Sequence, residues 1–99
     1  MTGYVYMLAS QKQGTIYIGV TGSLATRIPQ HRERKTKSFT QRYGVTRLVW
    51  YEEFFDIRDA IDREKELKKW RREWKIALIE AQNPGWSELF YGMGWDVPS

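Results

Sequence analysis

The chain has no cysteine, which excludes a disulfide framework, a thiolate zinc site and a cysteine nucleophile. Long apolar runs are missing too, because no segment approaches the ~18 apolar residues that a membrane-spanning helix requires. The opening segment MTGYVYMLAS lacks the basic stretch that begins a secretory leader. These absences predict a cytoplasmic protein that does not associate with a membrane.

The sequence patterns of the common nucleotide-binding and hydrolytic sites are absent as well. There is no P-loop, no dinucleotide-binding glycine pattern and no Ser-His-Asp arrangement. What the chain does contain is a hydrophobic fraction of 41% with five tryptophans in 99 residues, which predicts a single globular domain. Sixteen basic residues against 12 acidic ones give a net charge of +4, which weakly favours a polyanionic partner.

The pattern of apolar and turn residues predicts six secondary-structure elements. The expected strands are Tyr4–Leu8, Thr15–Val20 and Arg47–Phe55, and the expected helices cover about residues 24–34, 57–70 and 72–81. The first two strands surround a short polar loop with a glycine, which is typical of an antiparallel hairpin. The order β-β-α-β-α-α indicates an α+β domain with a small sheet and helices packed on it.

The second strand, within GTIYIGV, has an unusual face. Side chains alternate along a strand, so Ile16, Ile18 and Val20 share one face while Tyr17 and Gly19 share the other. Tyr6 of the first strand can lie on the same side as Tyr17 if the register allows it. A glycine inside a strand indicates a bulge, a close strand contact or space for a substrate or a neighbouring side chain.

The first expected helix carries Arg27 and His31 one turn apart. An arginine binds phosphate with two donors and an imidazole can transfer a proton, so this pair is a candidate phosphate site. Pro29 lies between them, where a proline removes a backbone hydrogen bond and clashes with the preceding turn. We expect either a kink or a helix that starts late enough for Pro29 to lie in its first turns.

An acidic residue interrupts the apolar face of the helix that begins at Ile57. The apolar face is formed by Ile57, Ala60, Ile61 and Leu67. The position that would continue it is Glu64, and a carboxylate there is costly unless it is paired or bound to a cation. Two interpretations stay open: an ion pair with Arg63, Lys68 or another basic neighbour at the edge of the face, or a ligand for a hard cation such as Mg²⁺ or Mn²⁺.

The segment KKWRREWK, residues 68–75, combines five basic residues with two tryptophans. Helical spacing groups the tryptophans with alanines and a leucine, at Trp70, Trp74, Ala77, Leu78 and Ala81. This pattern predicts that the tryptophans belong to the core rather than to a base-stacking surface. The charges then form either a solvated face or a surface that follows a nucleic-acid backbone.

Together these residues resemble the GIY-YIG nuclease superfamily, and most closely its small single-domain bacterial proteins that are uncharacterised. The resemblance covers about residues 3 to 89 and rests on Tyr4-Val-Tyr6, Tyr17-Ile18-Gly19, Arg27 with His31, Glu64 and Asn83-Pro84. The first triplet departs from Gly-Ile-Tyr but keeps Tyr6. The resemblance implies a three-stranded antiparallel sheet flanked by helices, in a domain of residues 1–89 followed by an irregular tail of residues 90–99.

The resemblance further implies an endonuclease that hydrolyses phosphodiester bonds of DNA rather than RNA with one divalent cation, Mg²⁺ or Mn²⁺. Glu64 would ligate the metal and Arg27 would hold the scissile phosphate. Tyr17 would act as the general base or orient the water, with Tyr6 beside it, and His31 matches a position that assists proton transfer in some relatives. Further substrate-binding residues would be Gly19, Asn83, Lys68, Lys69, Arg71 and Arg72.

Two other hypotheses compete with the nuclease. A nucleic-acid-binding module with the same fold could need a partner protein to supply specificity, since only the basic loop 32–47 and the helix over 68–75 are available to hold substrate. A structural protein with a vestigial site is disfavoured, because the residue set is intact. DNA repair or recombination is the process in which we expect the nuclease to act.

Overall fold

The structure of the protein is a computed structural model that describes residues 1–32 and 44–90. Its elements are β1 (Gly3–Ala9), β2 (Ile16–Thr21), α1 (Leu24–Arg32), β3 (Arg47–Phe54), α3 (Ile57–Lys68) and α4 (Arg72–Gln82). This order confirms the predicted α+β arrangement β-β-α-β-α-α. Residues 33–43 of the basic loop 32–47, which was expected to hold substrate, lie outside the described residues, as do residues 91–99 of the expected tail.

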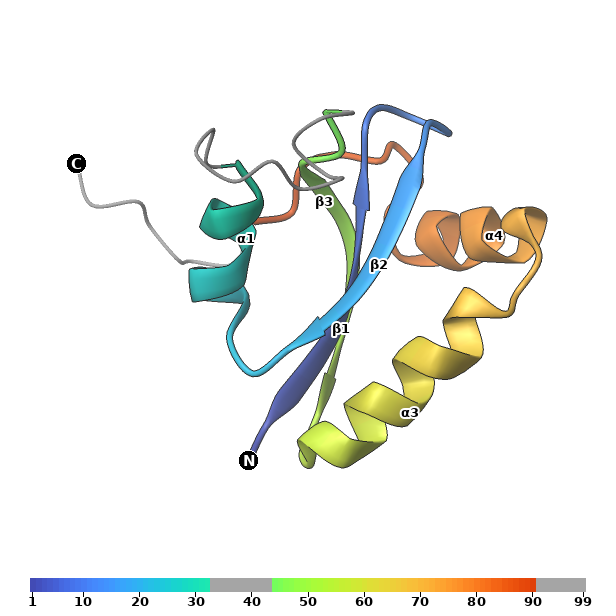
Figure 1. Ribbon diagram of the computed structural model, residues 1–99. Helices are drawn as coiled ribbons and strands as arrows, with labels where there is room; N and C mark the ends of the chain where they lie inside the picture. The colour runs from blue at the N-terminus through green and yellow to red at the C-terminus, as the bar shows by residue number, and fades with distance from the viewer. Residues whose placement is uncertain (33–43, 91–99) are drawn as a thin grey trace.

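The three strands form one antiparallel sheet in the order β2-β1-β3 (Figure 1). In the central strand, Tyr6 lies opposite Gly19 on one side and Tyr51 on the other. The pairing of β1 with β3 shifts register between Met7 and Leu8. Helix α1 covers one face of the sheet, whereas α3 and α4 cover the other (Figure 1).

The face toward α3 and α4 holds the larger part of the core. It is formed by Val5, Met7, Ala9, Ile18, Val49, Trp50, Ala60, Leu67, Ile79 and Trp86. Ile16 and Val20 pack against it from β2, as the alternation of side chains predicted. Burying each large apolar side chain contributes roughly 1.5–3 kcal/mol, so this cluster fixes α3 against β1 and β2.

The opposite face packs beneath α1. Its buried members are Tyr6, Leu8, Leu24, Ile28, Val45, Leu48 and Phe90, with Tyr17 and Tyr51 partly buried beside them. The even-numbered residues of β1 thus face α1, together with Tyr17. Phe90, the first residue of the expected tail, is buried here, and a domain boundary after residue 89 stays a prediction.

Helix α1 begins where the sequence indicates and places Arg27 in its first turn. The Ser23 hydroxyl accepts a hydrogen bond from the Thr26 amide (3.3 Å), and the Arg27 amide donates to the Ser23 carbonyl (3.0 Å). Such a serine satisfies amides that have no partner within the helix. The helix does not start late: it begins at Leu24 and contains Pro29, which lies exposed in its interior.

The sequence pattern predicted only part of the core contact around helix α4, because Trp70 and Leu78 pack against the core as expected while other expected positions do not. Ile79 is buried and Ile76 packs against the core, whereas Ala77 and Ala81 are exposed. The prediction of a core position was wrong for Trp74, which is 50% exposed and lies edge-on to Trp70, with ring centroids 6.1 Å apart. The branched side chains of Ile76 and Ile79 provide the contact instead, and α4 packs beside β3.

Gln82 at the end of α4, together with residues that follow the helix, covers the outer edge of β3. The Gln82 carboxamide donates to the Tyr51 carbonyl (3.1 Å) and accepts from the Tyr51 amide (3.4 Å). The Leu48 amide donates to the Glu88 carboxylate (3.0 Å), and the Leu48 carbonyl accepts from the Leu89 amide (2.8 Å). These bonds satisfy backbone groups of an edge strand that could otherwise pair with a strand of another molecule.

No helix among the described residues is long and apolar enough to cross a membrane.

Candidate active site

Tyr6 is the most enclosed polar side chain of the site. It is 1% exposed and lies in the middle of β1, across from Gly19. A Cβ atom at position 19 would lie 2.5 Å from both the Cζ and the hydroxyl oxygen of Tyr6. Gly19 therefore leaves room for the neighbouring phenol, which is one of the alternatives that the sequence left open.

Tyr17 lies beside Tyr6 on the same face of the sheet. The two ring centroids are 6.4 Å apart and the rings are tilted by 44°. Tyr17 is only partly buried, in contrast to Tyr6. The hairpin thus presents two phenols together, one enclosed and one accessible.

Arg27 of α1 joins the two phenols. Its guanidinium makes hydrogen bonds with the side chains of Tyr6 and Tyr17, and the bond with Tyr6 is the main cause that raises the pKa of Arg27. A further bond from Nη1 to Oε1 of Gln30 (3.2 Å) orients the guanidinium along α1. Sequence analysis did not identify Gln30, although its place three residues after Arg27 on a helix was an available signal.

Electrostatics at Tyr6 show how the groups of the site influence one another. Burial is the largest cause that raises the pKa of Tyr6 to about 12, and the hydrogen bond with Arg27 opposes it. Electrostatic interactions with Tyr17 and with the Glu64 carboxylate raise the pKa of Tyr6 further, whereas the charge of Arg27 lowers it. Tyr6 therefore stays a neutral phenol at ordinary pH, and Glu64 acts on the same site from α3.

Glu64 is largely shielded, with 16% of its side chain exposed, and its Oε2 lies 3.4 Å from Nζ of Lys68. Of the ion-pair partners considered from the sequence, Lys68 is the observed one. Arg63 instead pairs with Glu52 (3.1 Å) and with Glu66. The structure thus brings together Tyr6, Tyr17 and Arg27 from β1, β2 and α1. Glu64 of α3 is near enough for its charge to raise the pKa of Tyr6.

The site can hold a divalent cation if the protein supplies few of the ligands and water or substrate supplies the rest. Within residues 1–32 and 44–90, no three His, Cys, Asp or Glu side chains are grouped so that they could hold a metal. Mg²⁺ is commonly bound through one or two carboxylates, with water and substrate phosphate in the other positions. The single carboxylate of Glu64 matches that requirement, and a cage made of protein ligands is not offered by the described residues.

Two other predicted residues have different placements. His31 belongs to α1, one turn beyond Arg27, and its side chain is outside the described part of the chain. Asn83 is buried with 7% exposure, at the end of α4. Its Nδ2 donates to the carbonyls of Val49 (3.1 Å) and Ser87 (2.9 Å), and its Oδ1 accepts from the Ser87 amide (3.1 Å). A substrate contact by Asn83 would require these bonds to break.

The predicted basic residues at the start of α4 are not equivalent. The Nη2 atom of Arg72 donates to the carbonyls of Gln13 (2.6 Å) and Gly14 (2.8 Å), so Arg72 holds the β1–β2 loop. The Arg71 guanidinium lies 5.4 Å from the ring centroid of Trp74. Lys69 is exposed and its amide closes α3. Arg71 and Lys69 are thus more available to a ligand than Arg72.

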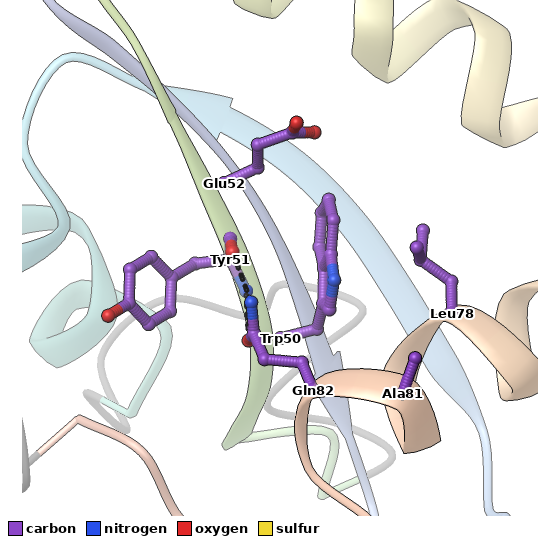
Figure 2. A pocket seen from close by; sticks show the side chains of 6 residues that line it. All are labelled: Trp50, Tyr51, Glu52, Leu78, Ala81 and Gln82. Atoms are coloured by element: carbon purple, nitrogen blue, oxygen red, sulfur yellow. Dashed lines mark hydrogen bonds between the residues drawn. The ribbon is translucent and has the colours of Figure 1, made fainter.

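A shallow hollow of about 280 Å³ lies between β3 and α4. It is lined by Trp50, Tyr51, Glu52, Leu78, Ala81 and Gln82. Figure 2 shows the Gln82 carboxamide facing the backbone of Tyr51, while the Tyr51 ring points away from Leu78 and Ala81. None of the four residues of the candidate site lines this hollow, so it is separate from that site.

Comparison with known proteins places the chain in a family of similar fold. Residues 2–77 match the GIY-YIG catalytic domain. The chain is 35% identical over 80 residues to a UPF0213 protein of Clostridium perfringens, covering 81% of this chain and 85% of that protein. A UPF0213 protein of Staphylococcus haemolyticus is 32% identical over 77 residues, covering 78% of this chain and 93% of that protein.

A solved structure is similar as well. The solution NMR structure of a UPF0213 protein from Bacillus halodurans is 30% identical, with a TM-score of 0.57, and the match covers 91% of this chain and 95% of that chain. The domain match includes Tyr6, Tyr17, Arg27 and Glu64 and spans most of the sequence. The chain therefore belongs to the GIY-YIG catalytic-domain family.

Proposed function

We propose that the protein is an endonuclease that hydrolyses phosphodiester bonds of nucleic acid, with DNA as the substrate and one Mg²⁺ or Mn²⁺ as the cofactor. The observation that supports the proposal is the cluster of two phenols and a guanidinium, together with a shielded carboxylate whose charge reaches Tyr6. Phosphodiester hydrolysis needs these parts: a positioned nucleophile, stabilisation of added negative charge and a hard-cation ligand.

Arg27 is the phosphate-binding group in this proposal. Its charge is permanent and its two terminal nitrogens can bind two phosphate oxygens at once. The bonds with the phenols and with Gln30 hold the guanidinium before substrate arrives. Such preorganisation stabilises the charge that develops on the phosphate without a cost of reorientation at that step.

The two tyrosines have different parts in the proposed mechanism. Tyr6 is enclosed and its pKa is raised to about 12, so it is suited to holding Arg27 and not to removing a proton. Tyr17 is accessible and bonded to the same guanidinium. We assign Tyr17 to orient the attacking water by accepting a hydrogen bond from it at the phenol oxygen, because a group that positions water must be within reach of it.

Glu64 is the proposed metal ligand. When bound, the cation would act as a Lewis acid toward the phosphate and lower the pKa of a water molecule. The protein's own contribution to metal binding is the shielded carboxylate of Glu64, whose charge reaches Tyr6.

A cytoplasmic location, a partner protein that supplies specificity and a part in DNA repair or recombination stay predictions.

The proposal is tested with the pure protein, plasmid DNA, branched DNA and RNA, each with Mg²⁺ or Mn²⁺. We expect nicking or cutting of DNA that is lost in Glu64→Gln and in Arg27→Gln. Asp62→Asn is the matched control, because Asp62 is an exposed carboxylate on the same helix, and it should cleave like the wild type. Salt-sensitive binding without cleavage under any metal would favour the binding-module hypothesis instead.

A further inference from the structure

The ion pair between Glu64 and Lys68 joins a shielded anion to an accessible cation. Glu64 is 16% exposed, whereas 54% of the Lys68 side chain is exposed, and the charged atoms are 3.4 Å apart. Glutamate one helical turn before lysine is the favourable order for such a pair. Because Glu64 is the proposed metal ligand, Lys68 can influence how tightly the metal binds.

We propose that Lys68 is a positioning residue that competes with the divalent cation for Glu64 and that, once displaced, binds a phosphate of the nucleic acid. This inference rests on the proposed function, since it takes Glu64 as the metal ligand. It adds a defined exchange: the ammonium leaves the carboxylate when the metal arrives. The exchange breaks the ion pair between Lys68 and Glu64.

The exchange follows from charge and burial. A shielded carboxylate is costly without a cation beside it, and Lys68 supplies that cation in the free protein. A divalent ion on the same carboxylate would repel an ammonium group that stayed a few ångströms away. The Lys68 side chain is flexible and half exposed, so it can swing toward solvent, where an incoming phosphate offers a new partner.

The neighbouring arginines are held by other groups. Arg63 bonds with Glu52 and Glu66, and its guanidinium lies 5.2 Å from the ring centroid of Trp70. Arg72 is bonded to the carbonyls of the β1–β2 loop. Lys68 is instead paired with Glu64, the carboxylate that would bind the metal.

The first experiment measures Mn²⁺ binding to the protein without nucleic acid, by the electron paramagnetic resonance signal of free Mn²⁺. Lys68→Gln should bind Mn²⁺ about twofold more tightly than the wild type. Lys65→Gln is the control, because Lys65 is exposed and adjacent residues of a helix do not face each other. Equal affinities of the two lysine variants would overturn the inference.

Failure of the proposed function gives a different result in the same measurement. Wild type and Glu64→Gln would then bind Mn²⁺ equally, which removes Glu64 as a ligand whatever Lys68 does. Circular dichroism of each variant checks that the fold is intact. The exposed position of Lys68 makes the fold insensitive to this substitution, so the comparison can be completed.

The second experiment measures affinity for a fluorescent DNA duplex, with Ca²⁺ as a cation and with EDTA, at several salt concentrations. With Ca²⁺, Lys68→Gln should weaken binding about threefold or more and reduce the salt slope by about one, as for a lost phosphate contact. With EDTA the loss should be smaller, because Glu64 retains the ammonium. Equal losses under both conditions would overturn the release of Lys68 to phosphate.

Discussion

Gly19 lies directly opposite Tyr6 in the pairing of β1 with β2, and its missing side chain is what admits the Tyr6 phenol. A Cβ at position 19 would lie 2.5 Å from the phenol oxygen, much closer than carbon and oxygen atoms pack. The glycine is therefore required by its neighbour rather than by backbone conformation. Because Tyr6 and Tyr17 bond with Arg27, the space that Gly19 leaves for Tyr6 also helps to fix the position of Arg27.

Gly19→Ala should displace the Tyr6 ring and disturb its bond with Arg27. We expect the free energy of unfolding to fall by about 1–3 kcal/mol, as for other overpacked cores, and nuclease activity to fall with it. Urea unfolding and a cleavage assay measure the two effects. Gly22→Ala is the control, since the nearest atom to a Cβ there is 3.6 Å away, and a similar loss in both variants would contradict this explanation.

Ionisation of Tyr6 should couple to folding at alkaline pH. Burial is the main cause of its raised pKa of about 12, against an ordinary value of 10.0. Because the folded pKa is the higher one, the stabilisation by the neutral phenol is complete below pH 10 and is lost as pH rises from about 10 to 12.

The free energy of unfolding of the wild type should therefore fall between about pH 9.5 and 11.5, by about 1–2 kcal/mol more than that of Tyr6→Phe. Urea unfolding at the two pH values measures this difference. Tyr51→Phe, a change at a partly buried tyrosine of the same face, should retain the wild-type decline. An equal decline in wild type and Tyr6→Phe would show that Tyr6 is not the coupled group.

The alternation of side chains was enough to predict the faces of the first two strands, because each strand has one apolar side to bury. The interrupted apolar face of α3 likewise singled out Glu64. Helical spacing favours Lys68 over Arg63 as the partner of Glu64, because residues four apart on a helix are neighbours and adjacent residues do not face each other. What neither pattern could predict is the ion pair between Arg63 and Glu52 of β3. Contacts between separate elements depend on packing that no local spacing encodes.

Asn83 shows why a buried polar residue is easily assigned to substrate from sequence. Its carboxamide makes three bonds to the backbone around β3 and the turn after α4. Asn83→Ala should leave those buried groups without partners and lower the free energy of unfolding by about 2–4 kcal/mol. Urea unfolding checks this, and Gln82→Ala, which removes two exposed bonds to Tyr51, should cost less than about 1.5 kcal/mol.

The same substitution separates a structural part from a substrate contact. If Asn83→Ala has the stability of the wild type but binds DNA more weakly, the prediction from sequence is correct and the bonds to Val49 and Ser87 matter little. The opposite pattern, lower stability with DNA affinity retained at low temperature, assigns Asn83 to the scaffold.

The residues by which α4 contacts the core differ in part from those that the sequence pattern predicted, and the reason is physical. Trp74, Ala77 and Ala81 follow helical spacing, but so do Ile76, Ile79 and Asn83. A hydrophobic pattern favours the tryptophan and does not count a buried asparagine that is satisfied by backbone groups. The contact with β3 decided between the two faces.

Two tryptophan substitutions test this assignment directly. Trp86 is buried, and its indole donates to Glu80 (2.9 Å), so Trp86→Ala should lower the free energy of unfolding by about 3–5 kcal/mol. Trp74→Ala removes a ring that is half exposed and should cost less than about 1.5 kcal/mol, a value typical of a single exposed aromatic contact. Urea unfolding followed by far-ultraviolet circular dichroism compares both variants with the wild type. Comparable losses would mean that Trp74 packs into the core after all, as its spacing had suggested.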